Sequence, residues 1–186
     1  MRELNSMRQT LRLNPIYNRE GRGDKGRVMS VDVKEELGKK LVWKDIFRAL
    51  NLHGIEVAKA NFLQTKKGTD CQDFHLDYTN EDSIEWTASL VPFTMFIYLG
   101  KCGLDVKQTK IKRYFMSGKE KETDSPLRRI MADSGDIIVV RGDVEHRGIE
   151  NPGDSGADRI VLLTRVVNGS PLLEPLEDAV NVTKYA

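Results

Sequence analysis

Two histidines and one aspartate have the residue types and the spacing to hold a metal ion. His75 and Asp77 stand two residues apart in the stretch DFHLDY, residues 73–78, and His146 follows much later in VEHRG. The chain has only one other histidine, His53. Side chains two residues apart on a β-strand point to the same face. If residues 73–78 form a strand, His75 and Asp77 therefore project side by side and can bind one ion.

His146 is the candidate for the third ligand. It follows an apolar strand pattern, DIIVV at 136–140, and a Gly-Asp turn. A jelly roll can bring such a late strand beside an early one. Two histidines and one carboxylate leave about three coordination positions open, which suits a non-haem Fe(II) that binds a co-substrate and oxygen together. A structural zinc ion more often has four protein ligands. The same three ligands would also accept Mn(II), Ni(II) or Zn(II).

A helical segment and a series of strands must position these residues. Apolar residues between 33 and 50 recur at helical spacing, with a break near Gly38 and a stop at Gly54. His53 is expected to cap this helix end. From residue 55 onward, seven or eight short segments rich in β-branched and aromatic residues alternate with turn-forming stretches such as GKCGLD at 100–105. The pattern predicts a mainly β fold with flanking helices, a double-stranded β-helix (jelly roll, cupin-like barrel).

The length and composition are those of one soluble globular domain, 1–186. We expect a flexible basic N-terminal segment over 1–30, a helical part over 31–54, the jelly-roll core over 55–168 and a C-terminal tail over 169–186. No apolar run is long enough to span a membrane and no signal-peptide core is present, so the expected location is the cytoplasm. The two cysteines, Cys71 and Cys102, form no CxxC pair and are expected to be free thiols.

The charge is balanced overall but unevenly spread. The formal net charge is +1, yet residues 1–27 carry seven Lys or Arg against three acids, and residues 107–129 carry eight against three. One interpretation is that both stretches are solvated surface. The other is that they attract an anionic substrate or partner.

With these residues in view, the chain resembles the Fe(II)- and 2-oxoglutarate-dependent dioxygenases. Their signature is His-x-Asp, a distal His and a basic residue on the next strand, which FHLDY, VEHRG and GADRIVLLTR would supply between about Phe62 and Val167. The resemblance implies Fe(II) at His75, Asp77 and His146, with 2-oxoglutarate and O2 as co-substrates. It further implies hydroxylation of a peptide side chain or small molecule, with release of succinate and CO2. The prolyl-hydroxylase-like and phytanoyl-hydroxylase-like branches are the two candidates.

The resemblance also assigns residues to the co-substrate. An arginine offers a bidentate, permanently charged partner for the far carboxylate of 2-oxoglutarate. Arg159 and Arg165 share one strand face, so both could point inward; we favour Arg159 for its distance from His146. Thr94 and Tyr98, on the expected strand at 92–100, are candidates for the wall of the co-substrate site. No substrate-binding residue and no oligomeric state follows from the sequence.

Three alternatives remain open. The spacing of Arg159 and Arg165 is similar to the Arg-x5-Arg of the nucleic-acid demethylase branch, and the basic stretches would suit a phosphate backbone. The chain has, however, no clear aromatic-rich base-flipping lid ahead of His75. A cupin-like barrel with another metal or none would serve as an isomerase or a binding module, although cupins usually carry a His-x-His pair, which is absent here. A degenerate dioxygenase fold used only for interaction is disfavoured by the intact triad.

Overall fold

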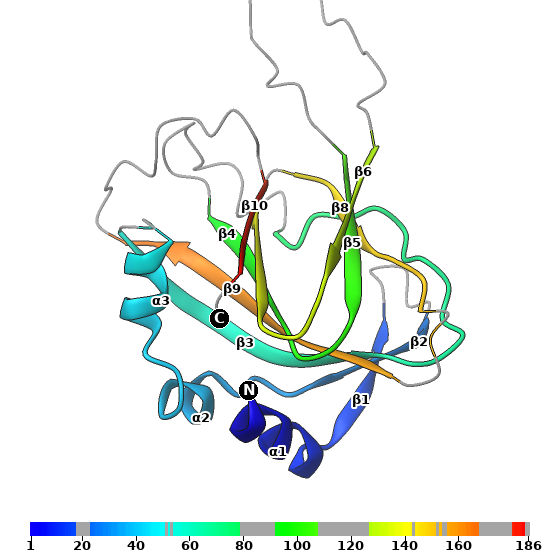
Figure 1. The fold of residues 1–186 in the computed structure, drawn as a ribbon, viewed down its shortest axis with the longest axis horizontal. Helices are drawn as coiled ribbons and strands as arrows, with labels where there is room; N and C mark the ends of the chain where they lie inside the picture. The colour runs from blue at the N-terminus through cyan, green and yellow to red at the C-terminus, as the bar shows by residue number, and fades with distance from the viewer. Residues whose placement is uncertain are drawn as a thin grey trace, which may run out of the picture.

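Two antiparallel β-sheets and three short helices make up the computed structural model (Figure 1). It describes residues 1–17, 23–50, 52, 54–78, 92–107, 127–142, 144–151, 153, 156–167 and 180–184. His53 and residues 108–126, most of the basic stretch at 107–129, lie outside this description. The prediction of a mainly β fold with flanking helices is confirmed.

The larger sheet has seven strands in the order β1-β2-β3-β9-β4-β7-β10. Their bounds are β1 Leu13–Tyr17, β2 Gly23–Ser30, β3 Ile55–Thr65, β4 Phe93–Tyr98, β7 Asp136–Arg141, β9 Ala157–Val166 and β10 Val180–Lys184. The smaller sheet has the order β6-β5-β8, with β5 Cys102–Lys107, β6 Leu127–Ala132 and β8 His146–Gly148. Strands distant in sequence are neighbours in both sheets, because the chain crosses from one sheet to the other as in a jelly roll.

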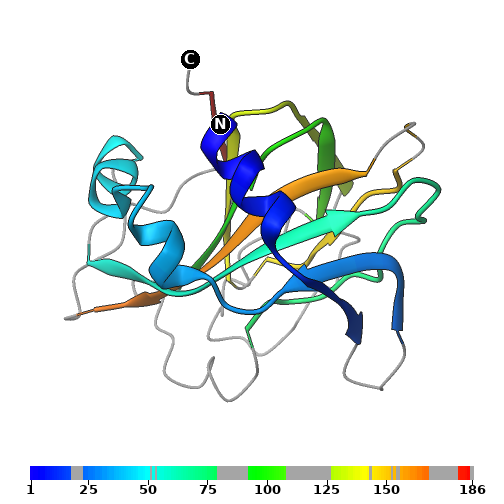
Figure 2. The ribbon, with the colours of Figure 1, turned by 90° about the horizontal axis from the view of Figure 1, so that it is seen from below.

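Each face of the larger sheet packs against a different layer. Along β4, Phe93, Met95 and Ile97 join an apolar core with the helices, whereas Phe96 and Tyr98 join a second core with the smaller sheet. This alternation follows from the two-residue period of a strand. The helices α1 Arg2–Thr10, α2 Lys34–Gly38 and α3 Trp43–Ala49 gather on one side of the larger sheet, with the smaller sheet on the other (Figures 1 and 2).

The helical part predicted over 31–54 is confirmed as two short helices, α2 and α3, rather than one. They are separated where the sequence pattern is interrupted after Gly38. Gly54 adopts a φ of +63°, a conformation that favours glycine, and the chain then turns into β3. No described helix is long and apolar enough to cross a membrane. Cys71 and Cys102 are both free thiols.

The N-terminal segment over 1–30, expected to be flexible, instead carries α1, β1 and β2. Leu4 of α1 is buried in the helix-side core, and Met7 packs against the same core. Strand β2 pairs with β3, with Val28 opposite Gln64. The expectation was wrong because a terminal helix and an outer strand need few apolar residues to bury one face, so a polar composition concealed them.

Two other local expectations are corrected. Residues 100–105 were expected to form a loop, but Cys102 begins β5, whose Cys102, Leu104 and Val106 pack in the second core. Glycine and aspartate at the alternate positions hide this strand from a composition argument, because both are depleted in strands. In the C-terminal tail, Val180–Lys184 forms β10 and pairs with β7 along the edge of the larger sheet.

The packing of α1 predicts that the N-terminal segment contributes to stability. Replacing Leu4 by Ala should lower the free energy of unfolding by about 2 kcal/mol, because a buried leucine is truncated. Urea denaturation followed by circular dichroism measures this change. The matched control is Leu127→Ala, since Leu127 is 55% exposed and its loss should change stability by less than about 0.5 kcal/mol. Equal, negligible effects of the two changes would restore the flexible interpretation of this segment.

Candidate metal centre

The segment that carries His75 runs antiparallel beside β8. The backbone N–H of His75 donates to the carbonyl of His146, and the N–H of His146 donates to the carbonyl of His75, both at 3.0 Å. A second bridge joins Thr69 to Asn151. The predicted strand over 73–78 is thus an extended segment with isolated bridges, but its pairing still places His75 and His146 directly opposite each other.

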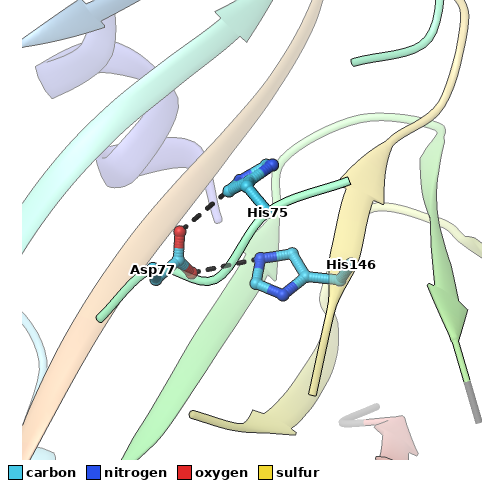
Figure 3. Close-up of side chains that lie close together, drawn as sticks. All are labelled: His75, Asp77 and His146. Carbon is cyan, nitrogen blue, oxygen red and sulfur yellow. Dashed lines mark ion pairs between the residues drawn. The ribbon is translucent and has the colours of Figure 1, made fainter. Parts of the chain in front are cut away.

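His75, Asp77 and His146 converge as the spacing predicted (Figure 3). Asp77 Oδ1 lies 3.6 Å from Nε2 of His75, and Oδ2 lies 3.2 Å from Nε2 of His146. The two imidazole rings are 4.9 Å apart between centroids and tilted by 53°. One ligand atom from each residue lies within 4.8 Å of the others, close enough to share one ion.

Backbone hydrogen bonds orient both imidazoles. Nδ1 of His75 donates to the carbonyl of Asp73 at 2.9 Å, and Nδ1 of His146 donates to the carbonyl of Val144 at 3.1 Å. A carbonyl oxygen only accepts, so Nδ1 carries the proton in each ring and Nε2 of the neutral ring presents a lone pair. Both lone pairs face Asp77. This second contact of each ring is the one that usually fixes a metal-bound histidine.

Charge and burial at Asp77 favour a cation. Burial alone would raise the pKa of Asp77, but His146 and His75 outweigh it and hold that pKa at about 2. Burial would likewise lower the pKa of His146, and contact with Asp77 raises it instead. Asp77 Oδ2 and His146 Nε2 are buried and have no hydrogen-bond partner. A buried carboxylate between two nitrogen lone pairs fits a divalent ion, which would satisfy all three groups.

Unsatisfied polar atoms are concentrated around this centre. Buried polar groups almost always have hydrogen-bond partners, so each exception requires an explanation. In the described part of the chain seven buried side-chain atoms lack one, and six of them surround the metal centre and the space beside Arg159: Asp77 Oδ2, His146 Nε2, Thr94 Oγ1, Tyr98 Oη, Arg27 Nε and Arg159 Nε. The pattern indicates a site for a second group beside the metal.

Arg159 carries the positive charge in the space beside the metal centre. It is only 2% exposed, and its contacts within the described residues are the Cys102 sulfur at 3.7 Å and the Phe96 ring at 5.8 Å, with no carboxylate. Tyr98 lies opposite it on β4, and burial raises the pKa of the Tyr98 hydroxyl above its usual range. An unpaired buried guanidinium is costly, so this arrangement favours an anionic ligand.

Arg165 and Thr94, the other two residues predicted for the co-substrate site, do not lie beside Arg159. The expectation that both arginines could point inward is wrong for Arg165, whose side chain is 68% exposed and pairs with Glu56, the residue opposite it on β3. Its position at the end of β9 leaves it beyond the second core. Thr94 is 1% exposed, and it makes a small contribution to the low pKa of Asp77, so it lies at the metal end of β4 rather than beside Arg159.

Two residues near the centre were not predicted. Phe96 packs edge-on against His146 at 5.5 Å and also contacts Arg159. The alternation of β4 could have identified it, because Phe96 lies between Thr94 and Tyr98 on the same face. Arg27 is buried and its Nε has no partner. No sequence pattern distinguishes it from the other basic residues of the N-terminal segment.

No family model and no curated protein matches the sequence. Solved structures do match. HygX from Streptomyces hygroscopicus, crystallised with nickel and 2-oxoglutarate, aligns with a TM-score of 0.64 and 13% identity over 89% of this chain and 77% of its own. An oxidoreductase of the 2OG-Fe(II) oxygenase family from Burkholderia pseudomallei aligns with a TM-score of 0.58 and 13% identity, over 90% of this chain and 81% of its own. A prolyl-4-hydroxylase from Pseudomonas putida aligns with a TM-score of 0.51 and 15% identity, over 90% of this chain and 82% of its own.

The chain therefore has the fold of the 2-oxoglutarate-dependent oxygenases. The coverage is high on both sides, so the likeness extends over the jelly roll as a whole. With so few identical residues it is a likeness of fold, and the chemistry rests on the side chains described above.

The geometry predicts that Asp77 is essential for metal binding. Asp77→Ala should weaken Ni(II) binding at least about 100-fold, because loss of even a supporting partner of a ligand costs 10–100-fold. Isothermal titration of the metal-free protein measures it. Asp73→Ala is the matched control: it removes an exposed carboxylate from the same segment while keeping the carbonyl that orients His75. Similar affinities for the two variants would remove Asp77 from the ligand set.

Proposed function

We propose that this protein is an Fe(II)- and 2-oxoglutarate-dependent oxygenase that hydroxylates a small molecule or a peptide side chain. The overall reaction consumes the substrate, 2-oxoglutarate and O2, and yields the hydroxylated product, succinate and CO2. One observation carries the proposal: a His-Asp-His centre lies on the same side of one sheet as a buried arginine that has no carboxylate partner among the described residues. That pair of features matches a co-substrate that chelates a metal at one end and carries a carboxylate at the other.

His75, Asp77 and His146 would hold the metal through Nε2, a carboxylate oxygen and Nε2. When bound, Fe(II) supplies the redox chemistry that couples decarboxylation of 2-oxoglutarate to oxidation of a C–H bond. The chain's own part is to keep Asp77 ionised and to aim both Nε2 atoms at the ion. The low pKa of Asp77 and the carbonyl contacts of the two Nδ1 atoms serve this purpose.

Arg159 and Tyr98 would bind the far carboxylate of 2-oxoglutarate. The guanidinium gives a bidentate, permanently charged partner and the Tyr98 hydroxyl adds a donor. Phe96 contacts both ends of this arrangement, since its ring lies 5.5 Å from that of His146 and 5.8 Å from Arg159 Cζ. An apolar ring at this position would pack against the methylene carbons of 2-oxoglutarate and exclude water between the two polar ends.

A small-molecule substrate is favoured over a peptide. HygX, with the higher TM-scores, is also crystallised with nickel, 2-oxoglutarate and hygromycin B, whereas the prolyl-4-hydroxylase aligns less well. The argument for a nucleic-acid substrate weakens, because Arg165 is exposed and paired with Glu56, which leaves the spacing of the two arginines without a joint role. A cupin-like barrel without a co-substrate gives no role to the buried Arg159. The free thiols of Cys71 and Cys102 support a reducing compartment such as the cytoplasm.

The proposal predicts turnover even before the substrate is known. Under air, the protein with Fe(II) and ascorbate should convert 2-oxoglutarate slowly to succinate, because bound Fe(II), 2-oxoglutarate and O2 are all the reactants that the decarboxylation needs. Succinate is measured by mass spectrometry. His146→Ala should reduce the rate to that of free Fe(II). Equal succinate yields from the wild type and His146→Ala, with both folded, would contradict an oxygenase function.

The two arginines should differ in their effect on the co-substrate. In the Ni(II)-loaded protein, Arg159→Gln should raise the Kd for 2-oxoglutarate by about 10- to 100-fold, because a charge-assisted hydrogen bond contributes about 1.5–3 kcal/mol. Arg165→Gln is the matched control and should change it less than twofold. Isothermal titration gives both values, together with the Ni(II) affinity, which neither change should alter. The reverse order of effects would assign the far carboxylate to Arg165.

A further inference from the structure

Arg27 of β2 lies in the interior although its strand stands outside the predicted jelly-roll core. It is 2% exposed and, with Arg159, is the largest of the fully buried side chains. Nη2 donates to the carbonyls of Asp70 at 2.9 Å, Gly148 at 3.3 Å and Ile149 at 2.8 Å. Nη1 pairs with Asp24 at 3.1 Å. Three of these four partners are backbone atoms from distant parts of the chain.

Those carbonyls belong to the two segments that carry the metal ligands. Asp70 lies on the segment that leads to His75, and Gly148 follows His146 by two residues on β8. Gln72 reinforces the connection, because its amide nitrogen donates to Asp24 at 2.6 Å and its amide oxygen accepts from the N–H of Gly148 at 2.9 Å. Through Arg27 and its partner Asp24, β2 is tied directly to both ligand-bearing segments.

Arg27 is also adjacent to Arg159. A β-carbon placed on Gly148 would lie 2.6 Å from Oε1 of Gln72, 2.9 Å from Nη2 of Arg159 and 3.4 Å from Nε of Arg27, so both guanidiniums border one point in the interior, beside the Gln72 amide oxygen. Gly148 has the same parity on β8 as His146, so this point lies on the face that carries the metal ligand. Burial lowers the pKa of Arg27, and the nearby charge of Arg159 lowers it further.

One donor that borders this point, Nε of Arg27, has no hydrogen-bond partner among the described residues. Nε of Arg27 and Nε of Arg159 are both buried and make no hydrogen bond. Asp24 balances one of the two positive charges, and the described residues provide no carboxylate for the other. An arginine that served only to connect backbone segments would have no reason to leave a buried donor directed beside a second guanidinium.

We propose that Arg27 is a second arginine of the co-substrate site, whose Nε and charge select a 2-oxo acid that carries a far carboxylate. The inference rests on the proposed function, because it concerns the same ligand. It extends the site beyond the jelly roll: the N-terminal strand β2 completes it. Arg159 provides a positive charge that has no carboxylate partner among the described residues, and Arg27 provides an additional donor. An uncharged tail in the same position would leave that donor unpaired and would therefore bind more weakly.

The test compares two ligands that differ only in the far carboxylate. With Ni(II)-loaded protein, isothermal titration gives the Kd of 2-oxoglutarate and of 2-oxopentanoate, which has the same chelating end and an uncharged tail. Arg27→Lys keeps the charge but loses Nε and the planar fork. It should weaken 2-oxoglutarate binding about tenfold, the equivalent of one hydrogen bond to a charged group, and change 2-oxopentanoate binding less than twofold. The Ni(II) affinity should remain within about threefold.

The control is Arg8→Lys, a half-buried arginine of the N-terminal segment that pairs with Asp158. This change should leave the Kd of both ligands unaltered. Equal weakening of both ligands by Arg27→Lys would mean that Arg27 only supports the metal centre, and no weakening would mean that it does not contribute; either result overturns the proposal. If the wild type itself fails to bind 2-oxoglutarate, the proposed function fails instead.

A second measurement needs no variant at Arg27. In the ¹⁵N-labelled protein loaded with Zn(II), the Nε–H signals of Arg27 and Arg159 can be assigned through bonds and followed by NMR. Adding 2-oxoglutarate should shift both signals, and adding 2-oxopentanoate should shift neither by a comparable amount. A shift confined to Arg159 would contradict the proposal even if Arg27→Lys does not fold.

Discussion

The carboxylate of Asp77 lies between two imidazole nitrogens with its Oδ2 atom buried, and much of the structure keeps these three groups together. A buried carboxylate is costly unless opposite charge or donors compensate it. Here the two nearest nitrogens present lone pairs in their neutral form, because each ring donates its proton from Nδ1 to a backbone carbonyl. A bound cation would compensate the carboxylate and accept both lone pairs. The three ligands are therefore positioned by the backbone around them as well as by their own contacts.

Those surroundings are mostly backbone. The segment leading to Asp77 pairs with β8 through reciprocal hydrogen bonds between His75 and His146, so the ligands cannot separate without breaking the pairing. Strand β4 then extends the site by alternation: Met95 and Ile97 face the helices, while Thr94, Phe96 and Tyr98 face the centre. The same two-residue period that builds the two cores therefore arranges a polar end, an apolar ring and a second polar end along one strand.

The sequence predicted what depends on local periodicity and residue chemistry. The spacing of His75 and Asp77 and the strand before His146 required only parity and composition, whereas a role for the basic residue on β9 was implied by the resemblance. Parity alone did not separate the two arginines, and Arg159 was favoured only for its distance from His146; the length of the sheet leaves Arg165 at its edge. Nor did the sequence predict Arg27, which is buried by contacts with carbonyls that only the folded chain brings together. Contacts between segments that are distant in the sequence produce no periodic pattern of residue types.

The central claim is that one site binds a metal and 2-oxoglutarate together through the residues described. The most direct measurement is the visible spectrum of the protein titrated with Fe(II) and then 2-oxoglutarate in the absence of oxygen. We expect a weak charge-transfer band that appears only when both are present and saturates at one equivalent of each, because the co-substrate chelates the bound metal. A folded protein that binds Fe(II) but gives no band with 2-oxoglutarate would contradict the account.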